Sequence, residues 1–476
     1  AKNKYYNRKM ELALREAEFA LVLSGRLNSY PQQELEEIWK EVLLYQFHDI
    51  IPGSSIKRVY DESLERYNLM YEKVVQIINE CYTSLTSGNQ YTLFNSLSWE
   101  RKYFFEADGV CYKTVIPPLG YTSKVFPISH IDISANDGIL ENKYLKVMFE
   151  NDGTLISLYS KILNRQYIKG KSNLFSVYDD IDTDSWDIPI EYADRLPGNF
   201  KLQSQCFYTN GLSAICHQKY TYLSSVIDID IILKHESDVL EFFATVDWNE
   251  TEKMLRVSFD TNIITDNASF EIQYGHITRR NNDNTTWETA QFEVCAHKWV
   301  DLSEKNCGIA LINDCKYGFR IKESTIDMNI LRSQRYPCTN GDNGIHHIGY
   351  CLYPHIGGIF DGNVTQKSYE FNITPTIKLG NGISGSTSDN YLFSVSDGVI
   401  VETVKKSEDS NDMIIRLYEP YGCHQTVKIA FNYLQTKIDL CDLLERYISN
   451  IGTNTKEAYL TLGPFEIITL KCSFCI

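Results

Sequence analysis

The sequence predicts an α+β protein of several domains, in which an N-terminal three-helix bundle is followed by antiparallel β-sandwich domains. Two patterns lead to this prediction. Apolar residues recur at helical spacing through the first 85 residues, and strand-and-turn patterns fill the chain from about residue 90 onward. Because no long helical pattern follows that point, we expect antiparallel sheets and not a parallel α/β sheet.

Three helical segments account for the predicted bundle. The first covers residues 4–23, with apolar residues on one face and arginine and glutamate on the other. The second opens at Pro31, which the first turn of a helix tolerates, and reaches Asp49. The third begins at Ser54 or the next serine, both favourable N-caps, and continues to about Cys81. Short connections between three such helices are typical of a bundle.

The β-region begins after a polar linker over residues 84–89. Residues 226–233 alternate apolar side chains with aspartates, which is the period of a half-buried strand. Asn151-Asp-Gly153 is a hairpin signal between two apolar runs, and the Gly- and Ser-rich residues 380–388 predict a boundary loop. The predicted domains are a three-helix bundle, a small β segment, a large β-sandwich region and a small C-terminal β-domain, at residues 1–85, 86–130, 131–380 and 390–476.

The charge of the chain excludes two classes of partner. The formal net charge is −16, and no cluster of Lys and Arg forms the basic face that nucleic acids or anionic membrane surfaces require. No apolar run approaches the length of a membrane span. We therefore expect neither a nucleic-acid partner nor a membrane partner.

The cysteines indicate a location. They number 13, an odd count, and are scattered through strand-like runs, which favours free thiols in a reducing compartment. We therefore predict a cytoplasmic protein. The C-x-x-C at Cys472 and Cys475 has no second pair and is interpreted as chance. Since the chain starts at Ala1 within a helical pattern, we expect it to be part of a longer or processed protein.

The pair His48 and Asp49 is the strongest candidate for chemistry. It lies where the second helix should stop, since Pro52 and Gly53 follow and break the helix. The pair puts a metal-ligating imidazole next to a carboxylate, and side chains at a helix end are well placed to face a cleft. The residue types also fit a local hydrogen bond between the two side chains, so that alternative stays open.

The run Tyr45-Gln-Phe-His-Asp-Ile-Ile-Pro-Gly-Ser-Ser55 resembles the signature of glycoside hydrolase family 38, the zinc-dependent α-mannosidases, and especially their cytosolic and bacterial branch. Further stretches resemble the same family in the same order, so the resemblance covers essentially the whole chain. They are residues 4–9, 14–18, 95–101, 246–250, 292–303, 311–318, 350–355, 416–422 and 464–470.

The resemblance implies a helical middle domain followed by β-domains, among them a large β-supersandwich. It also implies that the family's N-terminal α/β domain is missing from this sequence. That domain carries the nucleophile, the general acid and three of the four zinc ligands. By the resemblance, His48 is the fourth zinc ligand and Asp49 contacts the bound mannose. No catalytic residue is expected on this chain, which should be inactive alone.

The implied reaction is hydrolysis of terminal α-mannosidic bonds with retention. In the family, zinc orients the sugar and a carboxylate pair forms and hydrolyses a glycosyl-enzyme. The implied partners are a mannose-containing oligosaccharide, the missing N-terminal catalytic domain and further copies of the chain in a homo-oligomer. One alternative from another class stays open, a non-catalytic carbohydrate-binding or structural β-sandwich module with a helical appendage.

Two further residues are weaker candidates for substrate binding. Trp186 lies in the acidic segment 179–187, which resembles a family loop near the active site. The segment equally fits a solvated loop whose indole packs against the protein. The segment lacks the central Gly and terminal Glu of an EF-hand. Arg279 stands where the family usually has the sequence Arg-Pro-Thr-His. We expect it either to contact sugar or the missing domain, or to form a surface ion pair. Three histidines are expected to be structural, namely His346, His347 and His355.

Overall fold

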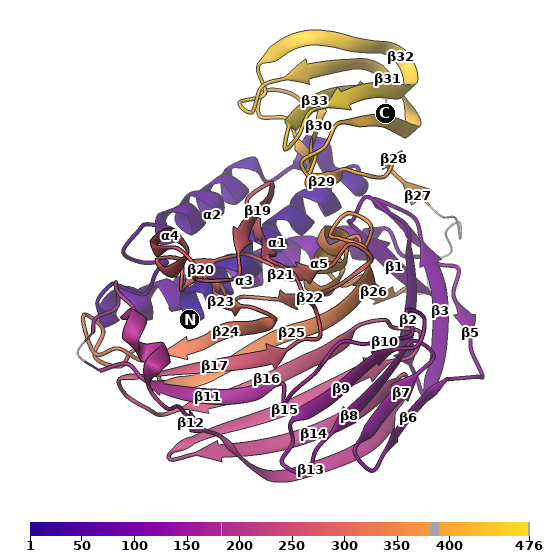
Figure 1. Ribbon diagram of the computed structural model, residues 1–476. Coiled ribbons are helices and arrows are strands. Elements are labelled where there is room, and N and C mark those ends of the chain that lie inside the picture. Colours follow the sequence, from indigo (N-terminus) through magenta and orange to yellow (C-terminus); the bar gives the residue numbers. More distant parts are fainter. Residues whose placement is uncertain (182, 381–389, 475–476) are drawn as a thin grey trace.

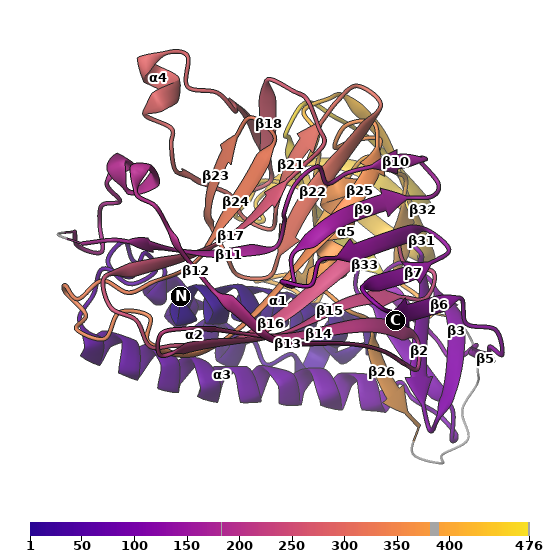
Figure 2. The same ribbon diagram turned by 60° about the horizontal axis from the view of Figure 1, so that its bottom comes forward.

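The computed structural model describes residues 1–181, 183–380 and 390–474. Three long helices lie along one side of the molecule, and antiparallel sheets make up most of the rest (Figures 1 and 2). The predicted α+β class, helical at the N-terminus and β-rich after it, is confirmed. The boundary loop predicted at residues 380–388 falls, apart from its first residue, outside the described residues. None of the described helices is both long and apolar enough to span a bilayer.

The helical layer buries one stripe of each helix. Its members are α1 (Lys2–Leu23), α2 (Gln32–Tyr45) and α3 (Lys57–Ser84), with a 3-10 turn (Arg26–Ser29) after the first. α1 packs against both other helices, and its Met10, Leu14 and Ala17 are fully buried. Val74 of α3 is fully buried in the same core.

α2 ends earlier than the sequence predicts. It stops at Tyr45, because the next backbone N–H, that of Gln46, bonds to the carbonyl of Leu43 at 3.2 Å, three residues back instead of four. This 3-10 hydrogen bond tightens the last turn and ends the helix. The prediction that the helix reaches Asp49 is therefore wrong. Asp49 and His48 lie in the turn that follows.

Two small sheets come next along the chain. The four-stranded sheet contains, in spatial order, β26 (Thr376–Leu379), β1 (Tyr91–Asn95), β4 (Gly120–Thr122) and β27 (Asn390–Tyr391). The three-stranded sheet contains β2 (Arg101–Ala107), β3 (Val110–Ile116) and β5 (Phe126–Pro127). β1 thus pairs with β26 and β4 with β27, so two early strands pair with strands more than 250 residues further along the chain.

Three larger sheets form the middle of the molecule. The nine-stranded sheet contains β13 (Lys201–Asn210), β14 (Ser213–Tyr222), β15 (Ser225–Lys234), β16 (Leu240–Trp248), β25 (Gly344–Ile356), β22 (Cys307–Asn313), β21 (Trp299–Ser303), β18 (Asn267–Ile272) and β19 (Gly275–Arg280). A six-stranded sheet contains β12 (Gly198–Asn199), β11 (Leu174–Asp179), β17 (Lys253–Asp260), β24 (Thr325–Arg332), β23 (Gly318–Lys322) and β20 (Val294–Cys295). A five-stranded sheet contains β10 (Arg165–Gln166), β9 (Leu155–Ser160), β8 (Leu145–Phe149), β7 (Ile139–Asn142) and β6 (Ile133–Asn136).

The core of this middle region lies between the sheets. In β15, Ile227, Ile229 and Ile231 are fully buried, whereas Asp228 and Asp230 point to the more accessible face. This is the alternation that the sequence predicts. The isoleucines share one hydrophobic cluster with residues of the six- and five-stranded sheets, which places those sheets against the nine-stranded one.

The C-terminal sheet completes the fold. It contains β28 (Phe393–Val395), β31 (Gln425–Cys441), β33 (Ile467–Phe474), β30 (Met413–Tyr418) and β29 (Ile400–Lys406), and β32 (Tyr447–Leu462) pairs with β31. Two short helices, α4 (Thr286–Thr289) and α5 (Val364–Asn372), lie in the preceding region. This sheet and the helical layer form one hydrophobic core, to which both Leu14 and Leu470 belong. α1 packs directly on β29 of this sheet, so the helical N-terminus lies beside the C-terminal sheet (Figure 1).

Candidate functional site

His48 and Asp49 lie on the turn between α2 and α3 with accessible side chains. The His48 side chain is 78% exposed and that of Asp49 is 43% exposed. His48 Nε2 and Asp49 Oδ2 are 3.5 Å apart, and the ring of Phe47 lies 4.2 Å from the imidazole. This separation is longer than a good N–H···O hydrogen bond, so neither group saturates the other.

The turn that carries this pair is anchored to the other two helices. Lys4 Nζ of α1 donates to the Pro52 carbonyl at 2.8 Å, and the Tyr60 hydroxyl of α3 accepts from the Ser55 N–H at 2.8 Å. Gly53 has a φ of 108°, which side-chain-bearing residues rarely adopt. A fixed backbone thus presents two accessible polar side chains, as a binding contact requires.

The described residues do not form a metal site by themselves. Within them, no group of three or more His, Cys, Asp or Glu side chains is placed to hold a metal ion. A zinc site takes three or four protein ligands, and this turn offers one imidazole with one carboxylate beside it. The turn can complete a metal site, but it cannot form one alone.

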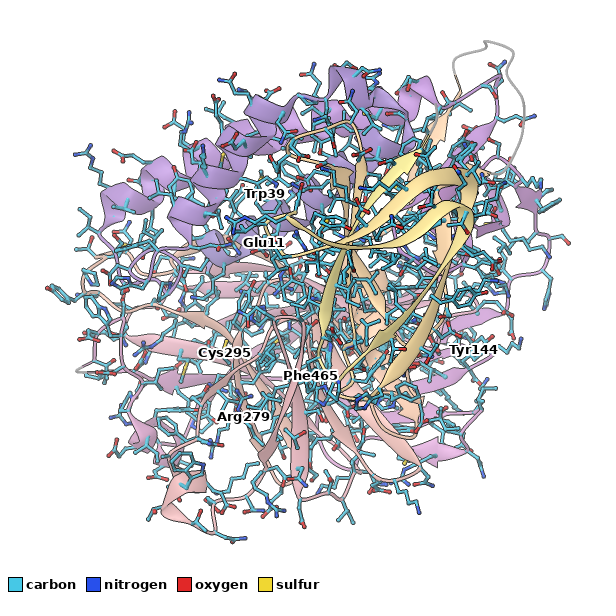
Figure 3. All side chains as sticks on the ribbon, turned by 90° about the horizontal axis from the view of Figure 1, so that it is seen from above. Glu11, Trp39, Tyr144, Arg279, Cys295 and Phe465 are labelled. Carbon is cyan, nitrogen blue, oxygen red and sulfur yellow. The ribbon has the colours of Figure 1, made fainter. Side chains whose placement is uncertain are left out.

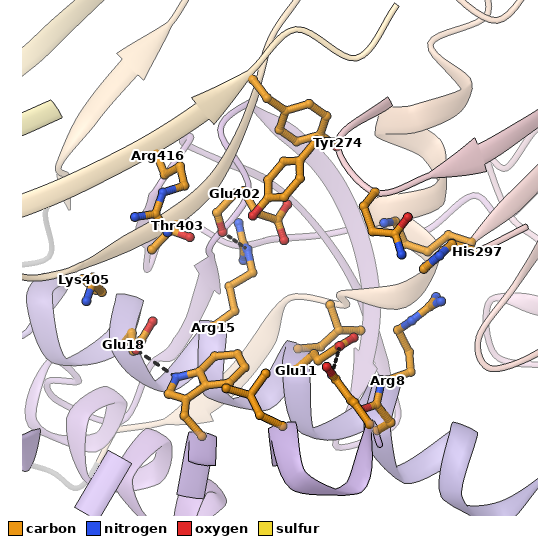
Figure 4. Close-up of a pocket in the computed structure, with 18 of the residues that line it drawn as sticks. Arg8, Glu11, Arg15, Glu18, Tyr274, His297, Glu402, Thr403, Lys405 and Arg416 are labelled. Atoms are coloured by element: carbon orange, nitrogen blue, oxygen red, sulfur yellow. Dashed lines mark hydrogen bonds between the residues drawn. The ribbon is translucent and has the colours of Figure 1, made fainter. Parts of the chain in front are cut away.

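Two pockets flank the turn, and Ile51 and Pro52 line both of them. The first, of about 910 Å³, lies between α1, α2 and the C-terminal sheet, and we call it the interdomain pocket (Figure 4). The second, of about 570 Å³, lies between the start of α1 and the loop of Trp186, and we call it the Trp186 pocket. Both volumes are in the range of small-molecule sites.

Trp186 lines its pocket with a half-exposed indole, whose ring lies 6.0 Å from that of Tyr336. The acidic segment before it is fixed by Asp180, which is fully buried and accepts a hydrogen bond from Arg332 Nε at 2.5 Å. The guanidinium of Arg332 therefore neutralises this carboxylate. The exposed indole leaves a face on which a ligand can stack.

Arg279 lies on β19 and makes no contact with the His48 turn. Its guanidinium covers the ring of Phe270 at 4.7 Å and donates to the Cys295 carbonyl at 3.4 Å. Burial lowers the pKa of Arg279. No acidic side chain in the described part of the chain forms a salt bridge with it, so a surface ion pair is not its role. Arg279 lies beside Cys295 (Figure 3), and Cys295 lines both pockets.

The three histidines of β25 have internal partners. His355 Nε2 lies 2.7 Å from Asp301 Oδ2, and both side chains are buried. A ring nitrogen of His346 contacts the Asp342 carbonyl at 2.5 Å, and His347 contacts a threonine hydroxyl at 3.2 Å. The contacts of His346 and His355 agree with the structural role that the sequence predicts, whereas His347 is exposed and contacts one threonine.

Three family models match the chain in series. The Alpha mannosidase middle domain matches residues 1–85, the Glycosyl hydrolases family 38 C-terminal domain matches residues 140–340, and the Glycosyl hydrolases family 38 C-terminal beta sandwich domain matches residues 398–470. The chain belongs to glycosyl hydrolase family 38. The resemblance inferred from the sequence motifs is thereby confirmed.

Curated relatives of this family 38 chain carry the name α-mannosidase. Alpha-mannosidase 2C1 of Homo sapiens is 29% identical over 507 residues, a match that covers 98% of this chain and 48% of that protein. Alpha-mannosidase G of Dictyostelium discoideum is 28% identical, with 94% and 48% covered. The chain thus spans about half the length of the curated relatives it matches.

A solved structure shares the fold. The crystal structure of an alpha-mannosidase from Enterococcus faecalis V583 superimposes with a TM-score of 0.84 at 16% sequence identity, covering 99% of this chain and 67% of that one. The arrangement of helices and sheets described above is therefore shared with that structure.

Sequence patterns missed the polar stripe of α1 in this family 38 chain. Periodicity assigns Arg8, Glu11, Arg15 and Glu18 to the polar face of the helix, but the C-terminal sheet covers that face, and all four line the interdomain pocket. Arg15 donates to the Glu402 carbonyl at 2.8 Å. The one available signal was an unbroken i, i+3, i+7, i+10 stripe of charged residues of both signs on a helix.

Proposed function

We propose that these residues form the helical and β-domain part of a zinc-dependent retaining α-mannosidase that hydrolyses terminal α-mannosidic bonds. In this proposal His48 supplies one zinc ligand and Asp49 contacts mannose. The observation that carries the proposal is an accessible His-Asp pair on an anchored turn, in a chain with three matches to family 38 and α-mannosidase domain models. The named α-mannosidase relatives support the substrate class.

The chemistry of the two side chains fits these roles. A neutral imidazole binds zinc through one ring nitrogen, and a nearby carboxylate helps to fix its orientation. The oxygens of Asp49 accept hydrogen bonds from sugar hydroxyls. Zinc, when bound, would hold and orient those hydroxyls. We place the nucleophile, the general acid and the remaining ligands outside these 476 residues, so the chain alone should be inactive.

The proposal includes location and assembly. All twelve described cysteines are free thiols, which suits a reducing compartment such as the cytoplasm. Self-association is the expected state of the intact enzyme, and light scattering at micromolar concentration would measure it.

The test uses the intact protein that contains these residues. Bound zinc and hydrolysis of an aryl α-mannoside are compared for wild type, His48→Ala and the control His347→Ala, which alters an exposed histidine. We expect the His48 variant to lose zinc and about 100-fold or more in kcat/KM, and the control to keep both. Unchanged zinc in the His48 variant would remove this residue from the site. Hydrolysis by the isolated chain at the intact rate would overturn the placement of the catalytic carboxylates.

A further inference from the structure

We propose that the interdomain pocket is a binding site for a neutral mannose oligosaccharide. The inference rests on the proposed function and deepens it, because it assigns saccharide contacts to residues outside the family motifs. The pocket, at about 910 Å³, is larger than one pyranose ring requires. Its walls come from α1, α2, the β18–β19 turn and the C-terminal sheet, so it exists only where these elements meet.

Aromatic rings form two of its walls. Trp39 of α2 is half-buried on the helical side, and Tyr274, on the turn between β18 and β19, is 37% exposed. Figure 4 shows Tyr274 across the pocket from Glu11 and Glu18. The ring of Tyr418 packs edge-on against Tyr274, with centroids 5.2 Å apart, and holds it in place. Flat aromatic faces of this kind can stack on the apolar face of a pyranose ring.

Three carboxylates offer acceptors to the same space. Glu11 accepts from Gln46 Nε2 at 2.9 Å, and Glu18 accepts from Trp39 Nε1 at 3.1 Å. Glu402 accepts from a tyrosine hydroxyl. The second oxygens of Glu18 and Glu402 have no donor among the residues that the structure describes, whereas the Asn7 side chain also hydrogen-bonds to Glu11. Carboxylate oxygens are strong acceptors, and a sugar supplies hydroxyl donors in several directions.

An unused donor faces the pocket as well. Arg8 is 5% exposed, and its Nη2 donates to the Tyr317 hydroxyl at 2.9 Å. Its buried Nη1 has no hydrogen-bond partner in the described residues. Burying a guanidinium donor without an acceptor is costly, and a ligand hydroxyl would satisfy it. His297 lies beside it, and burial, with help from Arg8, lowers the His297 pKa to about 4, so a neutral imidazole is present at pH 7.

The balance of charge favours a neutral ligand over an anion. Seven Lys and Arg residues and six Glu residues line the pocket within the described ranges, so neither sign dominates. The guanidinium of Arg15, which would otherwise attract an anion, is engaged by the Glu402 and Ser96 carbonyls at 2.8 and 3.0 Å. Burial raises the pKa of Glu11 and raises the pKa of Glu18 to about 7, so these carboxyl groups can donate as well as accept hydrogen bonds. A polyol, which donates and accepts hydrogen bonds at every hydroxyl, fits this surface.

The experiment is a calorimetric titration of the intact protein with thio-linked α-mannobiose, which is not hydrolysed. All variants carry His48→Ala, so that binding at the turn is weakened in every sample. Tyr274→Ala should raise Kd about tenfold and Glu11→Gln about fivefold, whereas Tyr274→Trp should retain binding. The matched control is Tyr447→Ala, which removes an exposed tyrosine of the C-terminal sheet away from the pocket and should leave Kd unchanged.

Three results would overturn the inference. They are a Kd that neither Tyr274→Ala nor Glu11→Gln changes, tighter binding of mannose 6-phosphate or sialyllactose than of the neutral disaccharide, and loss of mannobiose binding in His48→Ala alone. The outcome is separable from that of the proposed function. Loss of mannobiose binding in His48→Ala alone would place the sugar at the turn, refute the pocket and leave the zinc proposal standing. Unchanged zinc in His48→Ala, with pocket binding intact, would refute the zinc proposal and leave the pocket inference standing.

Discussion

The imidazole of His355 and the carboxylate of Asp301 form a buried pair with 2.7 Å between Nε2 and Oδ2. They lie on β25 and β21, which are separated by β22, so the contact crosses an intervening strand. Gly308 of β22 makes room for it, because a Cβ there would lie 2.4 Å from His355 Cε1. Asp301 also accepts from the Ser303 hydroxyl at 2.5 Å, so both carboxylate oxygens are engaged.

Removing the charge of Asp301 should be strongly destabilising. Asp301→Asn leaves a buried imidazole without its counter-ion, and we expect the free energy of unfolding to fall by about 3–5 kcal/mol in urea titrations. The control is Asp283→Asn, which removes a surface partner of Lys322 at 2.7 Å and should cost less than about 1 kcal/mol. Equal losses in the two variants would show that burial adds nothing to the His355 pair.

The same pair predicts a loss of stability as the pH rises above 6.5. Burial by itself would lower the pKa of His355, but the adjacent Asp301 carboxylate outweighs burial and raises it above 6.5. The folded state therefore binds this proton more tightly than the unfolded state. The resulting stabilisation is fully present below pH 6.5 and is lost as pH rises through the folded pKa. The stability difference between wild type and Asp301→Asn should shrink above that pH, and a constant difference would contradict the assignment.

His297 should respond to acid in the opposite sense. Burial, with Arg8 and Lys298 nearby, lowers its pKa from 6.5 to about 4. The unfolded chain takes up this proton near pH 6.5 and the folded chain only near pH 4, so stability falls as pH drops through that window. His297→Gln should flatten this part of a Tm-versus-pH curve. His347→Gln, which alters an exposed histidine, should leave the slope as it is.

The core shared by helices and C-terminal sheet predicts long-range effects of one substitution. Leu14 is fully buried there, and Leu14→Ala should cost about 2–5 kcal/mol of unfolding free energy. Leu69→Ala, at a site on α3 that is 47% exposed, should cost about 0.5 kcal/mol or less. Hydrogen exchange should speed up in both α3 and β30 of the Leu14 variant. Faster exchange confined to the helices would contradict a single core.

Backbone strain at Gly53 should disturb the site without unfolding the protein. With a φ of 108°, Gly53→Ala imposes about 1–3 kcal/mol of strain on the turn of His48, although the new methyl group would clash with nothing. We expect lower zinc content and lower kcat/KM in the intact enzyme. Gly358→Ala is the matched control, since it also meets nothing within 4 Å and its φ is not positive. Wild-type zinc affinity in Gly53→Ala would show that the turn does not need this conformation.

Local patterns predicted the elements of this fold but not the contacts between distant ones. Alternation in residues 226–233 identified a strand, because neighbouring residues determine which side chains face the core. The end of α2 depends on the hydrogen bond from Gln46 to Leu43, which apolar spacing does not report. The polar stripe of α1 lines a pocket only because Glu402 and its strand fold over it. Sequence periodicity does not indicate which distant strand covers a helix face.

The packing of α1 against the C-terminal sheet also sets the order of events during synthesis. Leu470, in β33, belongs to the same core as Leu14, and β33 pairs with both β30 and β31. The helices are synthesised before β29, so the side of α1 that packs on this strand stays uncovered until the strand has been made. A nascent chain stalled before residue 400 would therefore display this side of α1 and should be retained by chaperones.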